Sequence, residues 1–377
     1  MLAKIAILGC GAGAHAIAAL LAMREHEVTV VGADPVDTDR VNAIKEKGGI
    51  ELEGVIKGFG RVENATLSIE DGVRGKEYVF VVVPAFAHEY FLPKLAQVLD
   101  ASQKVLIIPD NWGSLRLLKM IKDLERNPPA VIGGTASLPF ACRISGPAKV
   151  KVVGVKDAGT IPLATIPSEK TVEFINELKG IFYEFAKARN ILEVILNNIN
   201  FPLHPTVTLL NLGRAEYTKG DFGFYSEGVT PSVAKIIEAV DAERRAVGKA
   251  LGLELPSLYE LESVMYKSSG AKGKDLYELL STNPAYRGIK GPDSIHHRYV
   301  MEDVPYGLVP IASLCDHLGM PCPTIKAIIH LFSVALGKDL MAEGVNVKKL
   351  GWEKAGPKEI IEIVEKGSGF NIESPPD

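Results

Sequence analysis

The segment KIAILGCGAGA, residues 4–14, decides the fold of the first half of the chain. The apolar run KIAIL is rich in residues that favour strands, and the glycine-rich turn after it leads into an apolar helical stretch, residues 14–24. A second strand is expected at EVTVV, residues 27–31. Strand, tight turn, helix and strand, with the turn in the register G-x-G-x-x-A, are typical of a dinucleotide-binding Rossmann unit.

Each position of this turn has its own physical role. Gly9 permits the tight turn, Gly11 lets the backbone approach a pyrophosphate, and Ala14 is small enough for close helix packing. The N–H groups at the helix start, including those of Ala12 and Gly13, would face the phosphates at the positive end of the helix dipole. We therefore predict that these five residues bind a nicotinamide dinucleotide.

The end of the second strand bears on the choice between NAD and NADP. A carboxylate normally closes this strand and binds the ribose 2′-hydroxyl, but the position holds Gly32, and the acidic residues begin later, at Asp34. Acids at this point would repel a 2′-phosphate, whereas Arg40 would attract one. We expect Asp34 to contribute to the cofactor site and favour NAD(H), with NADP(H) as the alternative.

Further strand-like runs alternate with helical patterns and predict a doubly wound parallel sheet. Pro84 ends a valine-rich strand, so the segment PAFAH should lie at the carboxyl edge where cofactor binds, with His88 as a loop residue. The expected strands are 78–83, 104–108 and 130–133, with an antiparallel pair at 150–155 and 160–165, and the expected helices are 90–99, 115–126 and 172–187.

The apolar period changes to three or four residues after residue 190, which indicates helices. We predict an α/β protein with an N-terminal Rossmann domain, residues 1–190, and an all-α substrate domain, residues 191–377. Capping and stop signals place helices at residues 230–251, 258–266, 274–280, 323–337 and 357–366.

Composition narrows the class of function. The chain has 377 residues, 47% of them hydrophobic and 23% charged, with a net charge of −4, as is ordinary for a globular enzyme. Without a basic field, neither nucleic acid nor a membrane is an expected partner, and small molecules are. The four cysteines have no metal-like spacing, and we expect reduced thiols in a cytoplasm. The oligomeric state stays open.

Two segments of the second half carry candidate site residues. In NNINFPLHPTVTLLNLGRAEY, residues 197–217, Pro205 suits a first helical position, which would put His204 at the N-cap. In GPDSIHHRYVMEDVPYGLVP, residues 291–310, Asp303 fits either a helix cap or a functional carboxylate. Arg298 has the planar fork that clamps carboxylates, although a surface arginine would look the same.

Over nearly its full length the chain resembles the opine dehydrogenase family, the octopine and N-(1-carboxyethyl) amino acid dehydrogenases. The resemblance lies in GCGAGA, VVVPAFAH, PDNWGS, TASLPFACR, NFPLHPTVTLLNLGRAEY and RYVMEDVPYGLVP, of which the last two are the most specific. A more distant similarity is to the 6-phosphogluconate and glycerol-3-phosphate dehydrogenase group.

The resemblance implies NAD(P)H-dependent reductive condensation of an α-keto acid, often pyruvate, with the amino group of an amino acid, and the reverse oxidation. It implies that His204 is catalytic, that Asp303 is its carboxylate partner, and that Arg298 clamps a substrate carboxylate. Cys142, within TASLPFACR, would line the keto-acid side. Imidazole suits the role because it exchanges protons near neutral pH.

Two alternatives remain at this level. A ketopantoate-type or β-hydroxyacid reductase would use a lysine such as Lys219 or Lys235 as its acid. A non-catalytic dinucleotide sensor would bind cofactor without turnover. The identities of the amino acid and the keto acid are not readable from the sequence.

Overall fold

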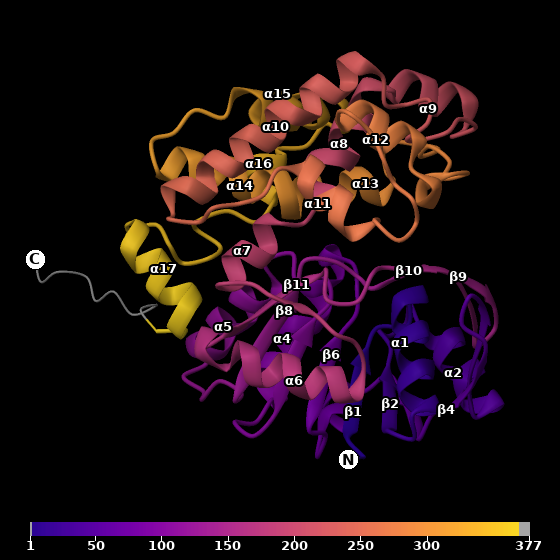
Figure 1. Ribbon diagram of the computed structural model, residues 1–377. Coiled ribbons are helices and arrows are strands. Elements are labelled where there is room, and N and C mark those ends of the chain that lie inside the picture. Colours follow the sequence, from indigo (N-terminus) through magenta and orange to yellow (C-terminus); the bar gives the residue numbers. More distant parts are fainter. Residues whose placement is uncertain (1, 369–377) are drawn as a thin grey trace, which may run out of the picture. The chain divides into compact units, whose positions relative to one another are not determined.

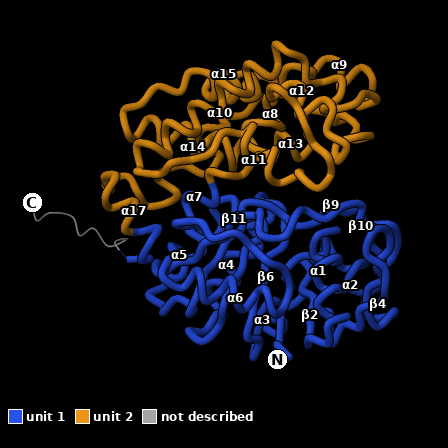
Figure 2. Tube along the Cα trace, viewed as in Figure 1, with its two compact units in different colours: residues 1–195, 363–370 blue, residues 196–362, 371–377 orange. Residues whose placement is uncertain are grey.

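The computed structural model describes residues 2–368, and these form two compact units (Figure 2). Among them, unit 1 comprises residues up to 195 together with residues from 363 onward, and unit 2 comprises residues 196–362. The domain limits inferred from the sequence, 1–190 and 191–377, stay a prediction.

The main sheet of unit 1 has eight strands (Figure 1). They are β1 (Lys4–Leu8), β2 (Glu27–Val31), β5 (Asn64–Thr66), β6 (Tyr78–Val81), β7 (Lys104–Ile107), β8 (Val131–Thr135), β11 (Pro162–Ile166) and β12 (Ala186–Lys187). Their order is β12-β11-β8-β7-β6-β1-β2-β5, and all neighbours are parallel except β8 and β11. The predicted doubly wound sheet is confirmed. Its order reverses between β1 and β6, where such sheets bind ligands.

A second, four-stranded sheet of order β4-β3-β10-β9 was not expected. Its strands are β3 (Gly49–Gly54), β4 (Gly58–Arg61), β9 (Phe140–Gly146) and β10 (Lys149–Val155). The predicted pairing of 150–155 with 160–165 is wrong, because β10 pairs with β9 and β3, while β11 joins the main sheet beside β8. The short β9–β10 turn, with Ala148 at φ 45°, closes that hairpin locally.

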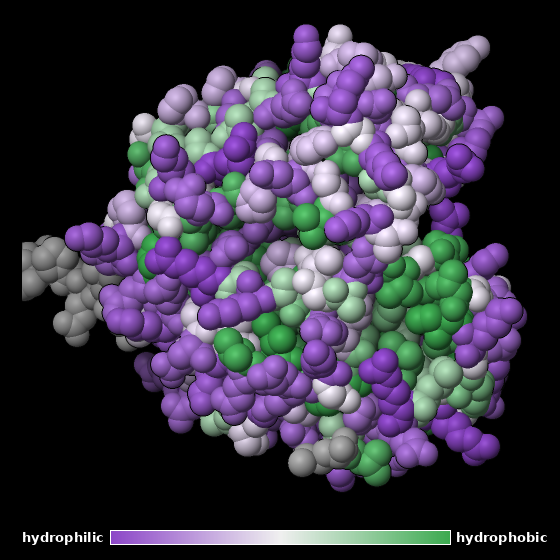
Figure 3. All heavy atoms as spheres, in the orientation of Figure 1, coloured by the Kyte–Doolittle hydropathy of each residue, from purple (hydrophilic) through white to green (hydrophobic). Residues whose placement is uncertain are grey.

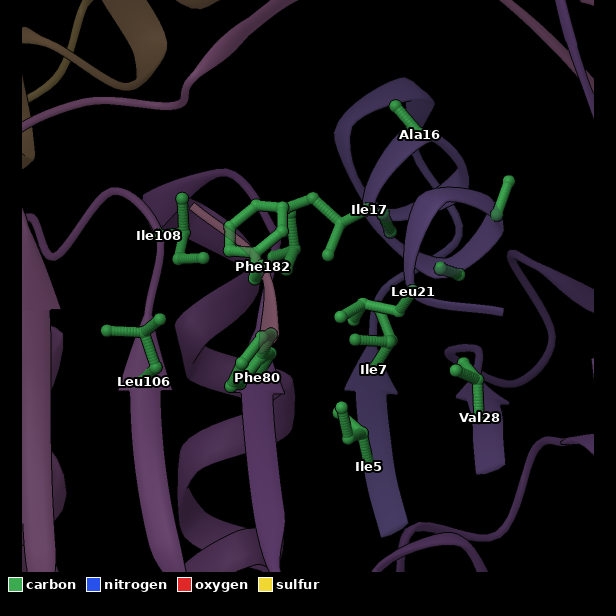
Figure 4. Packing of buried hydrophobic residues seen from close by; sticks show 14 of the residues in the cluster. Ile5, Ile7, Ala16, Ile17, Leu21, Val28, Phe80, Leu106, Ile108 and Phe182 are labelled. Carbon is green, nitrogen blue, oxygen red and sulfur yellow. The ribbon is translucent and has the colours of Figure 1, made fainter. Parts of the chain in front are cut away.

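Helices of unit 1 pack against the main sheet. Ile5 and Ile7 of β1 and Phe80 of β6 are fully buried and pack with Ile17 and Leu21 of α1 (Figure 4). Each such side chain stabilises the fold by roughly 1.5–3 kcal/mol. The helices are α1 (Ala12–Met23), α2 (Thr38–Lys47), α3 (Ile69–Val73), η1 (Ala85–Ala87), α4 (His88–Val98), α5 (Gly113–Asp123), η2 (Ser168–Lys170), α6 (Thr171–Ile181) and α7 (Ile191–Leu196).

The helix predicted at 172–187 is too long, since α6 ends at Ile181 and the chain then enters β12.

On the outside of unit 1, apolar side chains gather over β9 and β10 (Figure 3), where Ile144, Val153 and Val155 are exposed. None of the helices in residues 2–368 combines the length and the apolar composition needed to cross a membrane.

Unit 2 is helical, as predicted, and its described residues contain one isolated bridge, Gly223 to Lys290, but no strand. Its helices are α8 (Asn200–Leu210), α9 (Leu212–Thr218), α10 (Pro231–Ala250), α11 (Leu258–Met265), α12 (Leu276–Thr282), η3 (Pro284–Tyr286), α13 (Arg298–Met301), η4 (Val304–Leu308), α14 (Val309–His317), α15 (Pro323–Leu336), α16 (Leu340–Glu343) and the first part of α17 (Pro357–Lys366).

A buried arginine on α10 anchors the chain just before α8. Arg244 is 1% exposed and donates to Asp241 of its own helix. It also donates to the carbonyl of Leu196 at 2.8 Å and to that of Pro256 at 2.6 Å. Because a buried guanidinium must fill its donors, this network holds the chain at Leu196, four residues before α8 begins.

Candidate functional site

His204 lies inside α8, so the prediction that it caps the helix is wrong. The helix begins earlier because the side chain of Asn198 accepts the N–H of Asn200 at 3.0 Å. Pro202 then occupies the first turn, where N–H groups have no helical partner, and Pro205 falls in the interior of the helix. His204 is only 4% exposed and points into unit 2 among buried side chains.

The structure brings His204 and Asp303 together from positions 99 residues apart. Nδ1 of the imidazole lies 2.7 Å from Oδ2 of the carboxylate, and the Asp303 side chain makes no cap bond to η4. A Cβ at Gly307 would lie 2.3 Å from the Phe201 ring, so only glycine lets η4 pack this closely on α8. That close approach helps to place the carboxylate beside the imidazole.

Aromatic rings hold the imidazole in one plane. Tyr299 of α13 stacks on His204 with centroids 3.9 Å apart and an interplanar angle of 25°, and Phe224 meets it edge-on at 6.0 Å. A ring packed on its face and edge cannot turn freely. The contacts therefore preserve the orientation that the bond to Asp303 requires.

The second imidazole nitrogen also has a partner. Nε2 of His204 lies 3.2 Å from the hydroxyl of Tyr225, which is 4% exposed. Tyr225 stacks on Tyr286 at 3.9 Å, and the Tyr286 hydroxyl donates to the buried carboxylate of Glu262 at 2.7 Å. The imidazole thus lies between the Asp303 carboxylate and the Tyr225 phenol. The Tyr225 ring in turn stacks on Tyr286, whose hydroxyl is bonded to Glu262.

Burial dominates the electrostatics of this cluster. It raises the pKa of the Asp303 carboxyl from 3.8 to about 7, and the positive charge of Arg298 acts in the opposite direction. Arg298 is half exposed, with 53% of its side chain accessible, and lies 3.4 Å from Glu302 one helical turn later. Arg298 is thus accessible, and its charge acts on Asp303. Such a guanidinium can bind the carboxylate of a ligand.

In unit 1, the turn after β1 is tight, and the helix that follows it has no side-chain cap. Gly9 has φ +118°, and a Cβ there would lie 2.4 Å from the Val82 carbonyl oxygen, so this position accepts only glycine. Gly11 is the N-cap of α1, followed by Ala12, Gly13 and the fully buried Ala14. The helix start carries no side-chain cap, which leaves its N–H groups for a phosphate.

Gly11 provides a test of this turn. Its φ of −78° is ordinary, and no atom outside the immediate chain neighbours lies within 4 Å of a Cβ built there. We expect Gly11→Ala to fold with unchanged thermal stability but to bind NADH about tenfold or more weakly, because the methyl group would occupy space that the pyrophosphate needs. Fluorescence titration with NADH measures the change, and unchanged affinity would mean that the pyrophosphate lies elsewhere.

The loop after β2 holds the residues expected to read the ribose. Asp37 is buried and accepts the backbone N–H of Ala33 at 3.0 Å and a bond from Arg40 at 2.9 Å. Asp34 is exposed, and its carboxylate has no hydrogen bond or ion pair within residues 2–368. At the carboxyl edge of β6, Pro84 is exposed and precedes η1.

Two other residues of unit 1 were named in the sequence analysis, His88 as a loop residue and Cys142 as a residue of the keto-acid side. His88 is not a loop residue, because it starts α4 and is completely buried, and burial lowers its pKa to about 3. Cys142 lies on β9 opposite Val152 and packs partly against the core, where burial raises its thiol pKa to about 11. It is therefore a neutral thiol at physiological pH.

Sequence reasoning did not single out Tyr225 and Tyr299 as parts of the His204 cluster. Tyr299 stands inside the segment RYVMEDVP, whose local pattern gives no sign of a stack against α8. Tyr225 follows His204 by 21 residues, at a separation set by tertiary packing and not by any helical period. A chemical search for a donor to the second nitrogen of His204 would have been the one available signal.

Comparison with known proteins follows the same division of the chain. Residues 187–336 match the family described as NAD/NADP octopine/nopaline dehydrogenase, alpha-helical domain, and residues 5–164 match the ketopantoate reductase PanE/ApbA family. The opine dehydrogenase of Arthrobacter sp. (strain 1C) is 35% identical over 348 residues, which cover 92% of this chain and 94% of that protein.

Solved structures share the fold over nearly the whole chain. An octopine dehydrogenase with NADH and L-arginine superposes with a TM-score of 0.79 at 22% identity, covering 97% of this chain and 98% of that one. A yersinopine dehydrogenase with NADP⁺ bound gives a TM-score of 0.74 at 13% identity, covering 95% and 99%.

Proposed function

The chain belongs to the opine dehydrogenase family, and on this premise we propose that His204 and Asp303 are its acid–base dyad. The enzyme is an NAD(P)-dependent dehydrogenase that acts on CH–NH groups. It condenses an α-keto acid with the amino group of an amino acid reductively and catalyses the reverse oxidation. The single observation that carries the proposal is the buried 2.7 Å contact between His204 and Asp303.

The reaction requires a group that exchanges one proton at the amine nitrogen. The nicotinamide cofactor supplies or accepts the hydride at the neighbouring carbon. His204 accepts or donates the proton of the substrate's amine nitrogen. The Asp303 carboxylate accepts the Nδ1–H of the imidazole and stabilises the imidazolium when the ring is protonated. This arrangement leaves Nε2 as the nitrogen that gains and loses the proton.

Arg298 is the proposed clamp for a substrate carboxylate. The product of such a condensation carries a carboxylate on each side of its secondary amine, and a planar guanidinium binds one of them in bidentate fashion. The accessible side chain of Arg298 near the dyad supports this role. We propose Cys142 as a residue of the keto-acid side, where a neutral thiol would add a small, weakly polar surface.

A two-substrate assay tests the proposed function. NADH consumption is followed with pyruvate alone, with each amino acid of a broad panel alone, and with both together, and products are identified by mass. We expect turnover only when both are present, with a secondary amine dicarboxylate as product. Turnover with keto acid alone would indicate the reductase, and binding without turnover would indicate a sensor. Lys219 and Lys235, the candidate acids of the reductase, are both exposed.

We also propose that the enzyme prefers NAD(H). Asp34 presents an uncommitted carboxylate after β2, whereas Arg40 is already paired with Asp37. A 2′-phosphate would meet net negative charge here, and we expect kcat/KM with NADH to exceed that with NADPH by about tenfold or more. Asp34→Asn should narrow the ratio, measured as initial rates with each cofactor. A preference for NADPH in the native enzyme would reverse the assignment.

A cytoplasmic location is proposed as well. All four cysteines are free thiols in the structure, and three of them are buried. This state supports a reducing compartment.

A further inference from the structure

Both ring nitrogens of His204 are engaged within unit 2. Nδ1 faces Asp303 at 2.7 Å and Nε2 faces the Tyr225 hydroxyl at 3.2 Å. A neutral imidazole has one donor and one acceptor nitrogen, so the two partners determine which is which. With Asp303 ionised and accepting from Nδ1–H, Nε2 is the acceptor and Tyr225 donates its O–H to it. The basic lone pair of His204 is thus directed at Tyr225.

Neither ring can turn aside easily to free that lone pair. Tyr225 lies in a stack on Tyr286 with an interplanar angle of 13°, and Phe224 packs against its edge at 5.0 Å. His204 is stacked on Tyr299 at 3.9 Å. Tyr225, Phe224 and Tyr299 belong to one buried apolar cluster, so rotating Tyr225 out would disrupt the packing of unit 2.

The Glu262 carboxylate holds the ring on which Tyr225 stacks, that of Tyr286. It accepts the Tyr286 hydroxyl through both oxygens at 2.7 Å and is fully buried. Tyr286 is therefore held at its hydroxyl end as well as on its face. Because Tyr286 is fixed, the Tyr225 ring stacked on it keeps its hydroxyl within hydrogen-bonding distance of Nε2 of His204.

We propose that Tyr225 is the catalytic hydroxyl through which His204 exchanges its proton with the amine nitrogen of the substrate. This relay rests on the proposed acid–base role of His204. A tyrosine hydroxyl can accept one proton while it donates another, and it extends the reach of a buried imidazole by one hydrogen bond.

The step balances in the oxidative direction as follows. The N–H proton of the secondary amine passes to the oxygen of Tyr225 while the Tyr225 proton passes to Nε2 of His204. The C–H bond breaks with its electron pair, which leaves as hydride to NAD(P)⁺, and the nitrogen lone pair forms the C=N bond. The reductive direction reverses each transfer. Burial raises the pKa of Tyr225 well above its ordinary value, which keeps the phenol neutral throughout.

A proton inventory of the native enzyme tests the relay without altering any residue. The rate of single-turnover amine oxidation by enzyme-bound NAD⁺ is measured in mixtures of H₂O and D₂O. Two protons moving together give a curved dependence on deuterium fraction, which is the expected result. A linear dependence, with a hydride isotope effect showing that this step limits the rate, would overturn the relay.

Tyr225→Phe provides the second test, because it removes only the hydroxyl. We expect turnover to fall about 100-fold with NADH affinity unchanged, and the residual reaction to lose the curved inventory. Tyr183→Phe is the matched control, since it also removes a hydroxyl from a buried ring, one that donates to the carbonyls of Lys156 and Asp157 in unit 1. It should keep native turnover and the curved inventory.

The results for Tyr225→Phe and His204→Gln together distinguish failure of the relay from failure of the acid–base role on which it rests. A Tyr225→Phe enzyme with native turnover and a curved inventory would overturn the relay alone, provided that His204→Gln shows its expected loss of about 1,000-fold. An active His204→Gln enzyme would overturn the acid–base role of the dyad, and the relay with it.

Discussion

Substitution of His204 by glutamine is expected to lower turnover about 1,000-fold while leaving NADH affinity unchanged. Positioned acid–base groups contribute ~100- to 10,000-fold, and a buried imidazole between a carboxylate and a phenol should lie in the middle of that range. Glutamine keeps hydrogen-bonding capacity at this place but cannot take up a proton near neutral pH. The loss corresponds to about 4 kcal/mol of transition-state stabilisation.

The glycine turn predicted to bind the cofactor is in unit 1 and the dyad is in unit 2, so a substitution in the dyad should leave NADH affinity unchanged. Thr206→Val is a matched control on α8. Thr206 is completely buried, and its hydroxyl has no hydrogen-bond partner within the described chain. Removing it should leave turnover near the native value. A His204→Gln enzyme as active as this control would rule out His204 as the acid–base residue.

Substitution of Asp303 by asparagine is expected to lower turnover about 100-fold or more. The amide can present its NH₂ to Nδ1, which stabilises the tautomer with the proton on Nε2 and removes the basic lone pair. It also removes the negative charge that stabilises the imidazolium. Steady-state kinetics in both directions measure the loss. Turnover within about threefold of native would show that the carboxylate is dispensable.

The pH dependence of the native enzyme bears on the same pair. Burial raises the pKa of Asp303 to about 7, so the carboxylate takes up a proton as the pH falls through this region. Amine oxidation should therefore slow below about pH 7. A raised folded-state pKa also means that this carboxyl favours folding at low pH and loses that contribution as the pH rises from about 4 to about 7. Asp303→Asn should abolish both dependences at this site.

The Rossmann half was largely predictable because its signals are local. Strand β1, the glycine turn and α1 follow one another in sequence, and each has its own pattern. The second sheet was missed for the opposite reason. Strand β3 pairs with β10 about a hundred residues later, and neither strand reveals that partner through its own composition.

The candidate site shows the same limit. His204 and Asp303 were identified through family motifs, but the position of His204 in α8 was misjudged. Two prolines follow each other closely there, and Pro202, not Pro205, occupies the first turn, because Asn198 sets the helix start. The sequence pattern alone did not distinguish between them. Tyr225 was overlooked, since only the folded chain places its hydroxyl at Nε2.

Single-turnover oxidation of an N-(1-carboxyethyl) amino acid by enzyme-bound NAD⁺ tests the role of the dyad most directly. Stopped-flow absorbance of the nicotinamide reports hydride transfer itself, apart from substrate binding and product release. We expect the His204→Gln enzyme to bind both ligands and to form NADH about 1,000-fold more slowly than the native enzyme. A rate within about threefold of native would contradict the assignment of His204 and Asp303 as the catalytic acid–base pair.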